Sequence, residues 1–346
     1  MTPAPVTLPV PCAVMTGALG SGKTTLIRDW MERPEMAGTA LIVNEFGEIG
    51  LDHLLVSSAV ETTLLMENGC MCCSLRGDLV DMILNLFGSV ERGEIPPFHR
   101  IMIETTGLAD PVSIVRDLTV TPVLKGKVRL ACVATAVDGV LGRTGLDGDP
   151  VAINQVAQAD ICLITKTDLA DPLALDGLRE TLAAINPLMA VHEVRGGKAP
   201  PGDLLYGDDA SHSGAIPAAS DTPHHHHAHE VHGGVESWSV ALDRPLPWPD
   251  FRDWFDLVYS LNPAAMLRMK GILWIAERPC PLLVQAVGPL VTPPECLETW
   301  PEDRRSTRLV MITRGLAADA LARSFDEIVL HRRASAETST GGEIVV

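Results

Sequence analysis

Short apolar runs rich in Val and Ile alternate with longer stretches of helical periodicity through the first 200 residues. In one such stretch, residues 75–90, the apolar positions are spaced so that they share one helical face. Alternation of this kind is typical of a mostly parallel sheet covered by helices. The first part is therefore predicted to be an α/β domain of the nucleotide-binding type. The predicted strands are residues 12–16, 40–44, 63–66, 100–103, 128–137, 161–165 and 190–194.

A change of composition separates this part from a smaller second one. From about residue 200 to 234 the chain is rich in Gly, Pro, Ser, Ala, Asp and His and has hardly any large apolar residue, so we expect a mobile linker. Beyond it the pattern predicts strands at 235–242, 271–276, 282–287 and 308–312 and helices at 248–261 and 316–330. The predicted organisation is a nucleotide-binding domain (1–205), a His-rich flexible linker (206–234), a smaller α+β domain (235–331) and a loose tail (332–346).

The net charge of the chain and its clusters of His and Cys exclude some classes of function and favour others. The chain has 27 Lys and Arg against 44 Asp and Glu, a formal net charge of −17, which argues against a nucleic-acid partner. No apolar stretch approaches the roughly 18 residues of a membrane helix, and the N-terminus lacks a secretory signal, so we expect a cytoplasmic protein with no membrane partner. Seven of the eleven His fall between residues 212 and 232, and three of the eight Cys fall within 70–73. Both clusters indicate metal binding.

A phosphate-binding loop is the strongest motif. Residues 17–24 match the pattern G-x-x-x-x-G-K-[ST], directly after a predicted strand and before a predicted helix. Its glycines let backbone N–H groups surround phosphate oxygens, Lys23 supplies positive charge to the β- and γ-phosphates, and the Thr24 hydroxyl can ligate Mg²⁺. The alternative, a chance glycine-rich turn, is disfavoured by this placement. The predicted phosphate contacts are Gly17, Gly20, Ser21, Gly22, Lys23, Thr24 and Thr25.

A second acidic element is expected at a neighbouring strand end. Glu104 closes the apolar strand that begins at residue 100, and Gly107 follows three residues later. The carboxylate can hold Mg²⁺ through water or position the attacking water, and the glycine N–H can contact a γ-phosphate. Alone, such a strand end would be a solvated edge. Together with the phosphate loop it predicts Lys23, Glu104 and Gly107 as catalytic residues.

The sequence Thr-Lys-Thr-Asp at 165–168 indicates the base. Asp168 can accept hydrogen bonds from both N1–H and the exocyclic amine of guanine, and Lys166 can lie across the base plane. Thr165 stands where Asn is usual, and the loop around Gly196 is expected to close on the base. In the alternative interpretation Asp168 only caps a helix. We expect GTP and GDP as the nucleotides.

Cys70, Cys72 and Cys73 lie between a predicted strand and a predicted helix, on the same sheet edge as the phosphate loop. Thiolates at a helix start have lowered pKa values, and three sulfurs suit Zn²⁺, with Co²⁺ also accepted. The alternative is a buried structural role, which we expect for the cysteines in predicted strands. The residues predict a site for a divalent transition metal.

These motifs together resemble the CobW/YjiA family of metal-handling GTPases, in its YjiA-like branch. The resemblance rests on GALGSGKTTL, VNEFGEIGLD (residues 43–52), ENGCMCCSLRGDL (67–79), IETTGLADP (103–111) and TKTD, and on residues 268–274 in the second domain. It implies a P-loop GTPase of low intrinsic turnover that acts as a metallochaperone, with Glu45 and Glu48 in a switch-like loop. A His-rich linker is frequent in the family. The auxiliary metal ligands expected here are His224, His225, His226, His227, His229 and His232.

The expected function is therefore a GTP-dependent metallochaperone that binds a divalent metal, zinc first and cobalt second, at the Cys-x-Cys-Cys loop. Hydrolysis of GTP, with Mg²⁺, would transfer the metal to a client apo-metalloprotein. Two alternatives stay open: a metal-storage protein with a vestigial nucleotide site, and a small-molecule kinase, because kinases share the phosphate loop. In a further alternative, the His-rich segment is only a polar linker, and its histidines bind no metal.

Overall fold

The computed structural model describes residues 6–44, 63–65, 71–73, 79–207, 229–301 and 304–330 of the 346-residue chain. The chain divides into two compact units, the first holding strands β1 to β8 and the second strands β9 to β15. Each unit is described by itself. None of the helices among these residues has the length and apolar character needed to cross a membrane.

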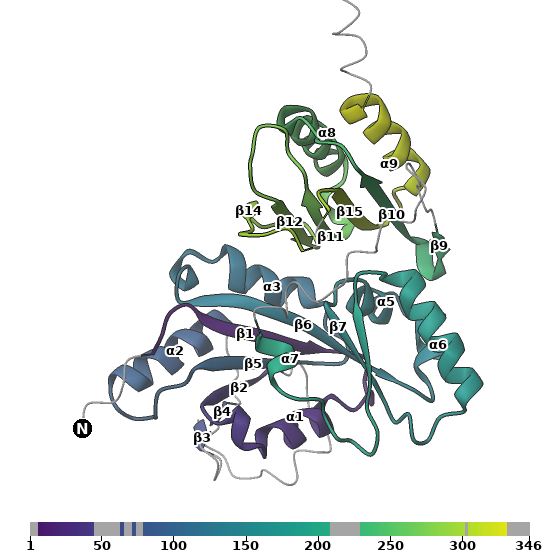
Figure 1. Ribbon diagram of the computed structural model, residues 1–346. Helices are drawn as coiled ribbons and strands as arrows, with labels where there is room; N and C mark the ends of the chain where they lie inside the picture. The colour runs from purple at the N-terminus through teal and green to yellow at the C-terminus, as the bar shows by residue number, and fades with distance from the viewer. Residues whose placement is uncertain are drawn as a thin grey trace, which may run out of the picture. The chain divides into compact units, whose positions relative to one another are not determined.

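The first unit is built on an eight-stranded sheet with the order β3-β4-β2-β5-β1-β6-β7-β8 (Figure 1). All neighbours pair in parallel except β3 and β4. The predicted α/β fold with a mostly parallel sheet is confirmed. The strands are β1 (Val10–Thr16), β2 (Thr39–Asn44), β3 (Thr63–Leu65), β4 (Met71–Cys73), β5 (Arg100–Thr105), β6 (Val128–Asp138), β7 (Ile161–Thr165) and β8 (Ala190–Glu193).

Helices cover both faces of this sheet, with α1 on one face and α3 on the other (Figure 1). The side chains of β1 alternate between the two faces: Ala13 and Met15 join the core formed with Leu26 and Trp30 of α1, and Cys12 and Val14 are equally buried. The helices are α1 (Lys23–Met31), α2 (Leu79–Glu91), α3 (Pro111–Val120), α4 (Gly142–Leu146), α5 (Pro150–Ala157), α6 (Pro172–Ile185) and α7 (Asp203–Tyr206), with short 3-10 turns η1 (Pro34–Met36) and η3 (Pro122–Leu124).

The second unit is an antiparallel sheet in the order β13-β12-β11-β15-β10-β9, with β14 paired to β12. Its core gathers Trp238, Trp254 and Phe325, whose ring centroids lie 4.9–5.5 Å apart. The predicted α+β character is confirmed. The elements are β9 (His229–Val231), β10 (Val235–Leu242), β11 (Met266–Leu273), β12 (Leu282–Val287), β13 (Leu290–Val291), β14 (Glu295–Cys296), β15 (Thr307–Arg314), α8 (Trp248–Leu261), α9 (Ala318–Phe325) and the turns η4 (His232–Gly234), η5 (Pro263–Ala265) and η6 (Asp326–Leu330).

A disulfide joins Cys280 to Cys296 at the edge of this second sheet, with the two Cα atoms 5.7 Å apart. Cys296 lies in β14, whose register places it opposite Leu282 of β12. The disulfide therefore fastens a two-residue strand to its neighbour. From the sequence these two cysteines were assigned no role, and the disulfide was not predicted.

Two expectations about local structure are wrong. The segment from 200 to 234 was expected not to pack, but its described ends do: Leu205 and Tyr206 of α7 are buried in the core of the first unit, and β9 pairs with β10. The cysteine cluster was expected in a loop at a helix start, but Cys72 and Cys73 lie in strand β4. In both places a few residues pair with a strand or pack in a core formed by distant parts of the chain. Local composition does not predict such contacts.

Candidate nucleotide site

The phosphate loop leaves β1 and leads into α1 as predicted. Gly17 has φ 134°, and a Cβ atom there would lie 2.3 Å from the carbonyl oxygen of Ala136, so only glycine fits against β6. Gly22, at φ 93°, is the N-cap residue of α1. The Lys23 ammonium donates to the carbonyl oxygens of Gly17 at 2.7 Å and Ala18 at 3.0 Å, across the mouth of the loop. The loop therefore presents backbone N–H groups and one cation at a helix N-terminus.

Glu104 and Thr24 meet beside this loop. β5 pairs in parallel with β1, in the register Met15 opposite Glu104. The Thr24 hydroxyl donates to Oε1 of Glu104 at 2.8 Å, and Glu104 is buried. A hydroxyl and a carboxylate oxygen in contact form the oxygen-rich donor set that Mg²⁺ accepts.

Gly107 lies directly against the phosphate loop. A Cβ atom on Gly107 would approach the backbone nitrogen of Leu19 to 2.4 Å, so the two loops touch through their backbones. The buried Gln155 of α5 holds this segment, because its amide nitrogen donates to the carbonyl oxygens of Gly107 at 3.3 Å and Ala109 at 3.0 Å. The amide thus fixes the loop that follows Glu104.

Asn154 and Gln155 of α5 act on this loop together with Gln158, the C-cap residue of the helix. Asp110 caps α3 by accepting from Val112 N at 3.0 Å, and its carboxylate also accepts from Asn154 at 2.9 Å and Gln158 at 3.1 Å. Sequence reasoning missed Asn154, Gln155 and Gln158. The signal that could have found them is three carboxamides within five residues of an otherwise apolar helix.

Thr165 and Lys166, after β7, tie the base-reading loop to the phosphate loop. The buried Thr165 hydroxyl donates to the carbonyl oxygen of Ser21 at 2.7 Å. Lys166 has φ 54°, an uncommon backbone state for a residue with a side chain, and its ammonium donates to the carbonyl oxygen of Gly20 at 2.9 Å and to Oδ2 of Asp138 at 2.6 Å. Thr165 therefore makes, through its hydroxyl, a direct contact between the two loops.

Asp138, at the end of β6, was not singled out by sequence reasoning. Its Oδ1 accepts from the backbone nitrogens of Val140 at 2.8 Å and Leu141 at 3.1 Å, and its Oδ2 receives Lys166. Burial raises the pKa of Asp138, but the hydrogen bonds from Lys166, Val140 and Leu141 outweigh it, so the pKa lies below its usual value. The carboxylate stays charged and holds Lys166 over the loop.

Asp168 and Gly196 also meet. Oδ1 of Asp168 accepts from the backbone nitrogen of Gly196 at 2.9 Å, and this hydrogen bond lowers the pKa of the exposed Asp168 carboxyl. Gly196 and Gly197 have φ 56° and 71°, a turn that glycine adopts readily. The carboxylate is thus oriented by the loop that was expected to close on a base.

The cysteine cluster is described only through its backbone. β4 pairs in parallel with β2, with Cys72 opposite Leu41 and Cys73 opposite Ile42, while β2 pairs in turn with β5. Cys73 therefore sits two strands from the strand that carries Glu104. Within the described residues no group of three or more His, Cys, Asp or Glu is placed to hold a metal ion. Cys70, Glu45, Glu48, His224, His225, His226 and His227 lie outside the described residues.

The remaining two linker histidines are placed by their backbone. His229 lies in β9 opposite Ser237, and His232 begins η4. His229 thus lies in the edge strand of the second sheet, and His232 lies in the turn that follows this strand. By contrast, Cys12, Cys132 and Cys162 are buried and belong to no disulfide, in line with the structural role expected for them.

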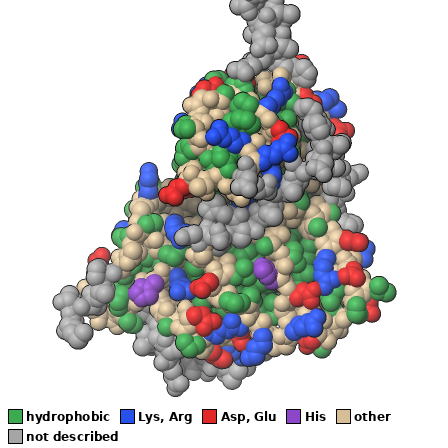
Figure 2. All heavy atoms as spheres, in the orientation of Figure 1, with side chains coloured by type: hydrophobic (Ala, Val, Ile, Leu, Met, Phe, Trp, Pro, Cys, Tyr) green, Lys and Arg blue, Asp and Glu red, His purple; other side chains and the backbone are tan. Residues whose placement is uncertain are grey.

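Figure 2 shows Lys and Arg side chains interspersed with Asp and Glu on the face of the first unit in view. Ion pairs in this unit join Arg179 to Asp176 and Glu193, and Arg92 to Glu94 at 2.6 Å. All are substantially exposed, and such surface pairs contribute little to stability. Their mixture of signs agrees with a chain that is acidic overall.

Comparison with known proteins covers both units. Residues 11–193 match the family described as CobW/HypB/UreG, nucleotide-binding domain, and residues 235–329 match the cobalamin synthesis protein cobW C-terminal domain. The zinc chaperone YjiA of Escherichia coli is 31% identical over 317 residues, which cover 92% of this chain and 98% of that protein. The zinc chaperone CobW of Sinorhizobium sp is 28% identical over 339 residues, covering 88% and 92%. The crystal structure of the Zn(II)-bound YjiA GTPase from E. coli superposes with a TM-score of 0.73 at 29% identity, covering 92% and 99%.

Proposed function

The chain belongs to the CobW/HypB/UreG family, and from this premise we propose that it is a zinc chaperone that binds and hydrolyses GTP. One observation carries the proposal: three loops from distant parts of the chain meet at the carboxyl edge of the first sheet. Thr165 contacts Ser21 at 2.7 Å, and Thr24 contacts Glu104 at 2.8 Å. Loops that would bind phosphate and base are thereby held as one site.

Different residues would bind the phosphates, the base and the attacking water. The backbone of Gly17, Gly20, Ser21, Gly22 and Thr25 surrounds the phosphates, and Lys23 leaves its two carbonyl partners to contact the β- and γ-phosphates. Asp168 accepts the two guanine N–H groups, Lys166 lies over the base, and Gly196 closes the loop. Glu104 orients the attacking water, and the N–H of Gly107 donates to the γ-phosphate.

Thr24 and Glu104 would hold Mg²⁺, since their contacting oxygens form a suitable donor set. When bound, the ion neutralises charge on the β- and γ-phosphates. Glu45 and Glu48 are proposed to join it from the switch-like loop.

The cargo metal is proposed to bind at Cys70, Cys72 and Cys73. Thiolates favour zinc, and cobalt is the second choice. The place of β4 beside β2 supports a coupling in which the nucleotide orders the metal loop and GTP hydrolysis releases the ion to a client apo-metalloprotein. The six histidines between residues 224 and 232 would be auxiliary ligands of modest affinity and poor selectivity.

The test separates the two sites. Lys23→Ala should abolish GTP turnover and leave zinc affinity without nucleotide unchanged, because Lys23 lies in the phosphate loop. A Cys72→Ser/Cys73→Ser double variant should weaken zinc binding and leave GTP affinity unchanged.

Other outcomes would favour the rival functions. Zinc loading and delivery that are unaffected by Lys23→Ala would indicate a storage protein with a vestigial nucleotide site. Transfer of the γ-phosphate to a metabolite in place of water would indicate a kinase. Unchanged zinc affinity in the double cysteine variant would overturn the thiolate assignment.

A further inference from the structure

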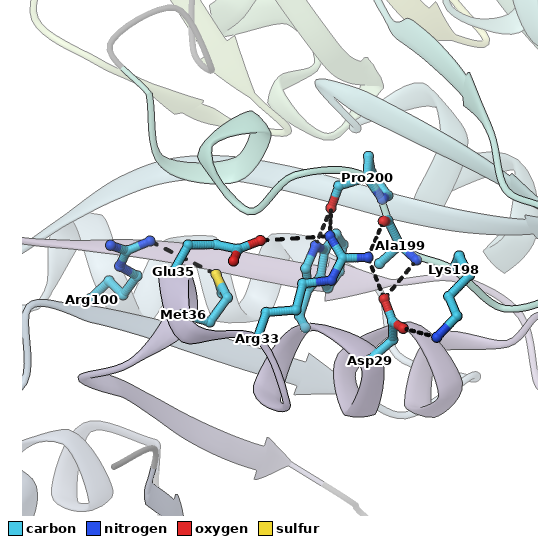
Figure 3. A network of polar contacts seen from close by, with 9 residues as sticks. Asp29, Arg33, Glu35, Met36, Arg100, Lys198, Ala199 and Pro200 are labelled. Carbon is cyan, nitrogen blue, oxygen red and sulfur yellow. Dashed lines mark hydrogen bonds and ion pairs between the residues drawn. The ribbon is translucent and has the colours of Figure 1, made fainter. Parts of the chain in front are cut away.

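A network of polar contacts joins the C-terminal end of α1 and Arg33, which follows it, to the chain after β8 (Figure 3). The Asp29 carboxylate accepts from the backbone nitrogen of Ala199 at 3.0 Å, from the ammonium of Lys198 at 3.1 Å, and from the guanidinium of Arg33. Arg33 also donates to the carbonyl oxygens of Ala199 and, at 3.0 Å, of Pro200. The side chains of Asp29, in α1, and of Arg33, two residues after the helix ends, therefore bind the backbone of residues 199–200 at both a donor and an acceptor group.

The contacts differ in how well they are shielded from solvent. The Asp29 side chain is 14% exposed and that of Arg33 24%, whereas Lys198 is 80% exposed. Solvent therefore screens the Lys198 contact, and the hydrogen bonds to backbone groups matter most. A nearby contact adds to them: Nε1 of Trp30, also on α1, donates to the carbonyl oxygen of Pro200 at 2.6 Å.

Residues 199–200 lie at the end of the loop that carries Gly196. Where the loop begins, the Thr167 hydroxyl donates to the carbonyl oxygen of Val194 at 3.0 Å, and the Asp168 carboxylate accepts from the backbone nitrogen of Gly196. The turn then closes with the backbone nitrogen of Lys198 donating to Arg195 at 3.1 Å. Only a few residues separate the beginning of the loop from the contacts with α1, so the loop is fixed at both ends.

The same helix begins at the phosphate site. α1 starts at Lys23, and Thr24 contacts Glu104. A Cβ atom on Gly197 would lie 2.9 Å from the Thr25 side chain, so the helix also touches the middle of the turn. α1 thus begins at the predicted phosphate site, and Asp29 near its C-terminal end, together with Arg33 just beyond it, binds the end of the base loop.

We propose that Asp29 and Arg33 are positioning residues that set the guanine-binding loop at a fixed distance from the phosphate site. They act through the backbone of residues 199–200 on Gly196, and through Gly196 on Asp168. The inference rests on the proposed GTP-binding function. It assigns α1 a second role, in base selection, in addition to binding phosphate at its N-terminus.

Loss of the hydrogen bonds from Asp29 and Arg33 to residues 199–200 should make the loop more mobile without unfolding the unit. Beyond Pro200 the chain is anchored independently, because the Tyr206 hydroxyl donates to the carbonyl oxygen of Ile101 at 3.0 Å and Leu205 is buried in the core. Substitution at Asp29 therefore removes one of several attachments of this segment.

The experiment compares Asp29→Asn with Glu32→Gln, a matched control that removes the same charge from an exposed position on or next to the same helix. Each protein is titrated with GTP, with ATP, and with inorganic tripolyphosphate, which occupies the phosphate site but has no base. For Asp29→Asn we expect GTP to bind about fivefold more weakly, with tripolyphosphate unchanged. Glu32→Gln should change neither.

Three results would count against this account. Unchanged GTP affinity in Asp29→Asn overturns the positioning role. An equal loss for GTP and tripolyphosphate also overturns it, since that pattern indicates general damage to α1. If the unmodified protein binds GTP no better than ATP, the proposed function itself fails, and the inference fails with it. Arg33→Gln provides a second variant and should reproduce the base-dependent loss.

Discussion

The contact between Thr165 and Ser21 leads to a direct prediction, because it joins the base loop to the phosphate loop through a single hydroxyl. Thr165→Val keeps the shape of the side chain and removes the donor. The carbonyl oxygen of Ser21 then loses a buried partner that lies at 2.7 Å, and the weaker contact to Val137 at 3.3 Å is lost as well.

The expected cost follows from that geometry. A hydroxyl donates one proton, so the change removes one net hydrogen bond and leaves a buried acceptor without it, which costs about 1–2 kcal/mol after a small gain from the added methyl group. For a unit of this size, about 2–4 °C of melting temperature is lost per kcal/mol. We therefore expect the first unit to melt roughly 2–8 °C lower, and GTP to bind about threefold more weakly because the phosphate loop loses an anchor.

The assay is thermal unfolding of the nucleotide-free protein together with a GTP titration. Thr119→Val is the matched control: the same atoms are exchanged at an exposed helix position where the hydroxyl donates to Val115 at 2.7 Å. Its stability should change by less than about 0.5 kcal/mol. If Thr165→Val behaves like Thr119→Val in both measurements, the hydroxyl does not connect the loops.

Three further predictions concern other parts of the fold. Gly107→Ala should lower the GTP hydrolysis rate by roughly tenfold to 100-fold in a single-turnover assay, because the added Cβ displaces backbone of the phosphate loop; a normal rate would contradict the packing. Reducing the Cys280–Cys296 disulfide, which closes a segment with a sequence separation of 16, should destabilise the second unit by roughly 3 kcal/mol in calorimetry, and a double serine variant should no longer respond to reductant. The pKa of the Asp138 carboxyl is lowered in the folded state, so its stabilising effect is present above the pH at which a free aspartate titrates and is lost as the pH falls through the folded pKa. Asp138→Asn should therefore reduce the pH dependence of the free energy of unfolding below about pH 4. An unchanged pH dependence in that range would show that the pairing with Lys166 is not coupled to folding.

The sequence predicted well those elements whose signals are local. Residues 235–242 and 248–261 were expected as a strand and a helix, and the structure has them with the same bounds as β10 and α8. The phosphate loop and Glu104 were also placed correctly at adjacent strand ends, because parallel strands bring their carboxyl ends to one edge. Regular periodicity and a dense motif are enough for these features.

Features set by distant partners were missed. β4 is three residues long and exists through its pairing with β2 and β3, and nothing in Met-Cys-Cys announces it. Asp29 and Ala199 are 170 residues apart in sequence, so no local pattern could join them. The carboxamides of α5 have the same character, because their function depends on the loop they contact. Polar contacts between remote segments carry much of the site's geometry and leave little trace in the sequence.

The central claim is that nucleotide state controls metal binding. The most direct measurement is the zinc affinity of the full chain, once with a non-hydrolysable GTP analogue and once with GDP. The account predicts tighter zinc binding with the analogue, by about tenfold, which corresponds to a coupling of about 1.4 kcal/mol. Equal affinities in the two states would contradict it.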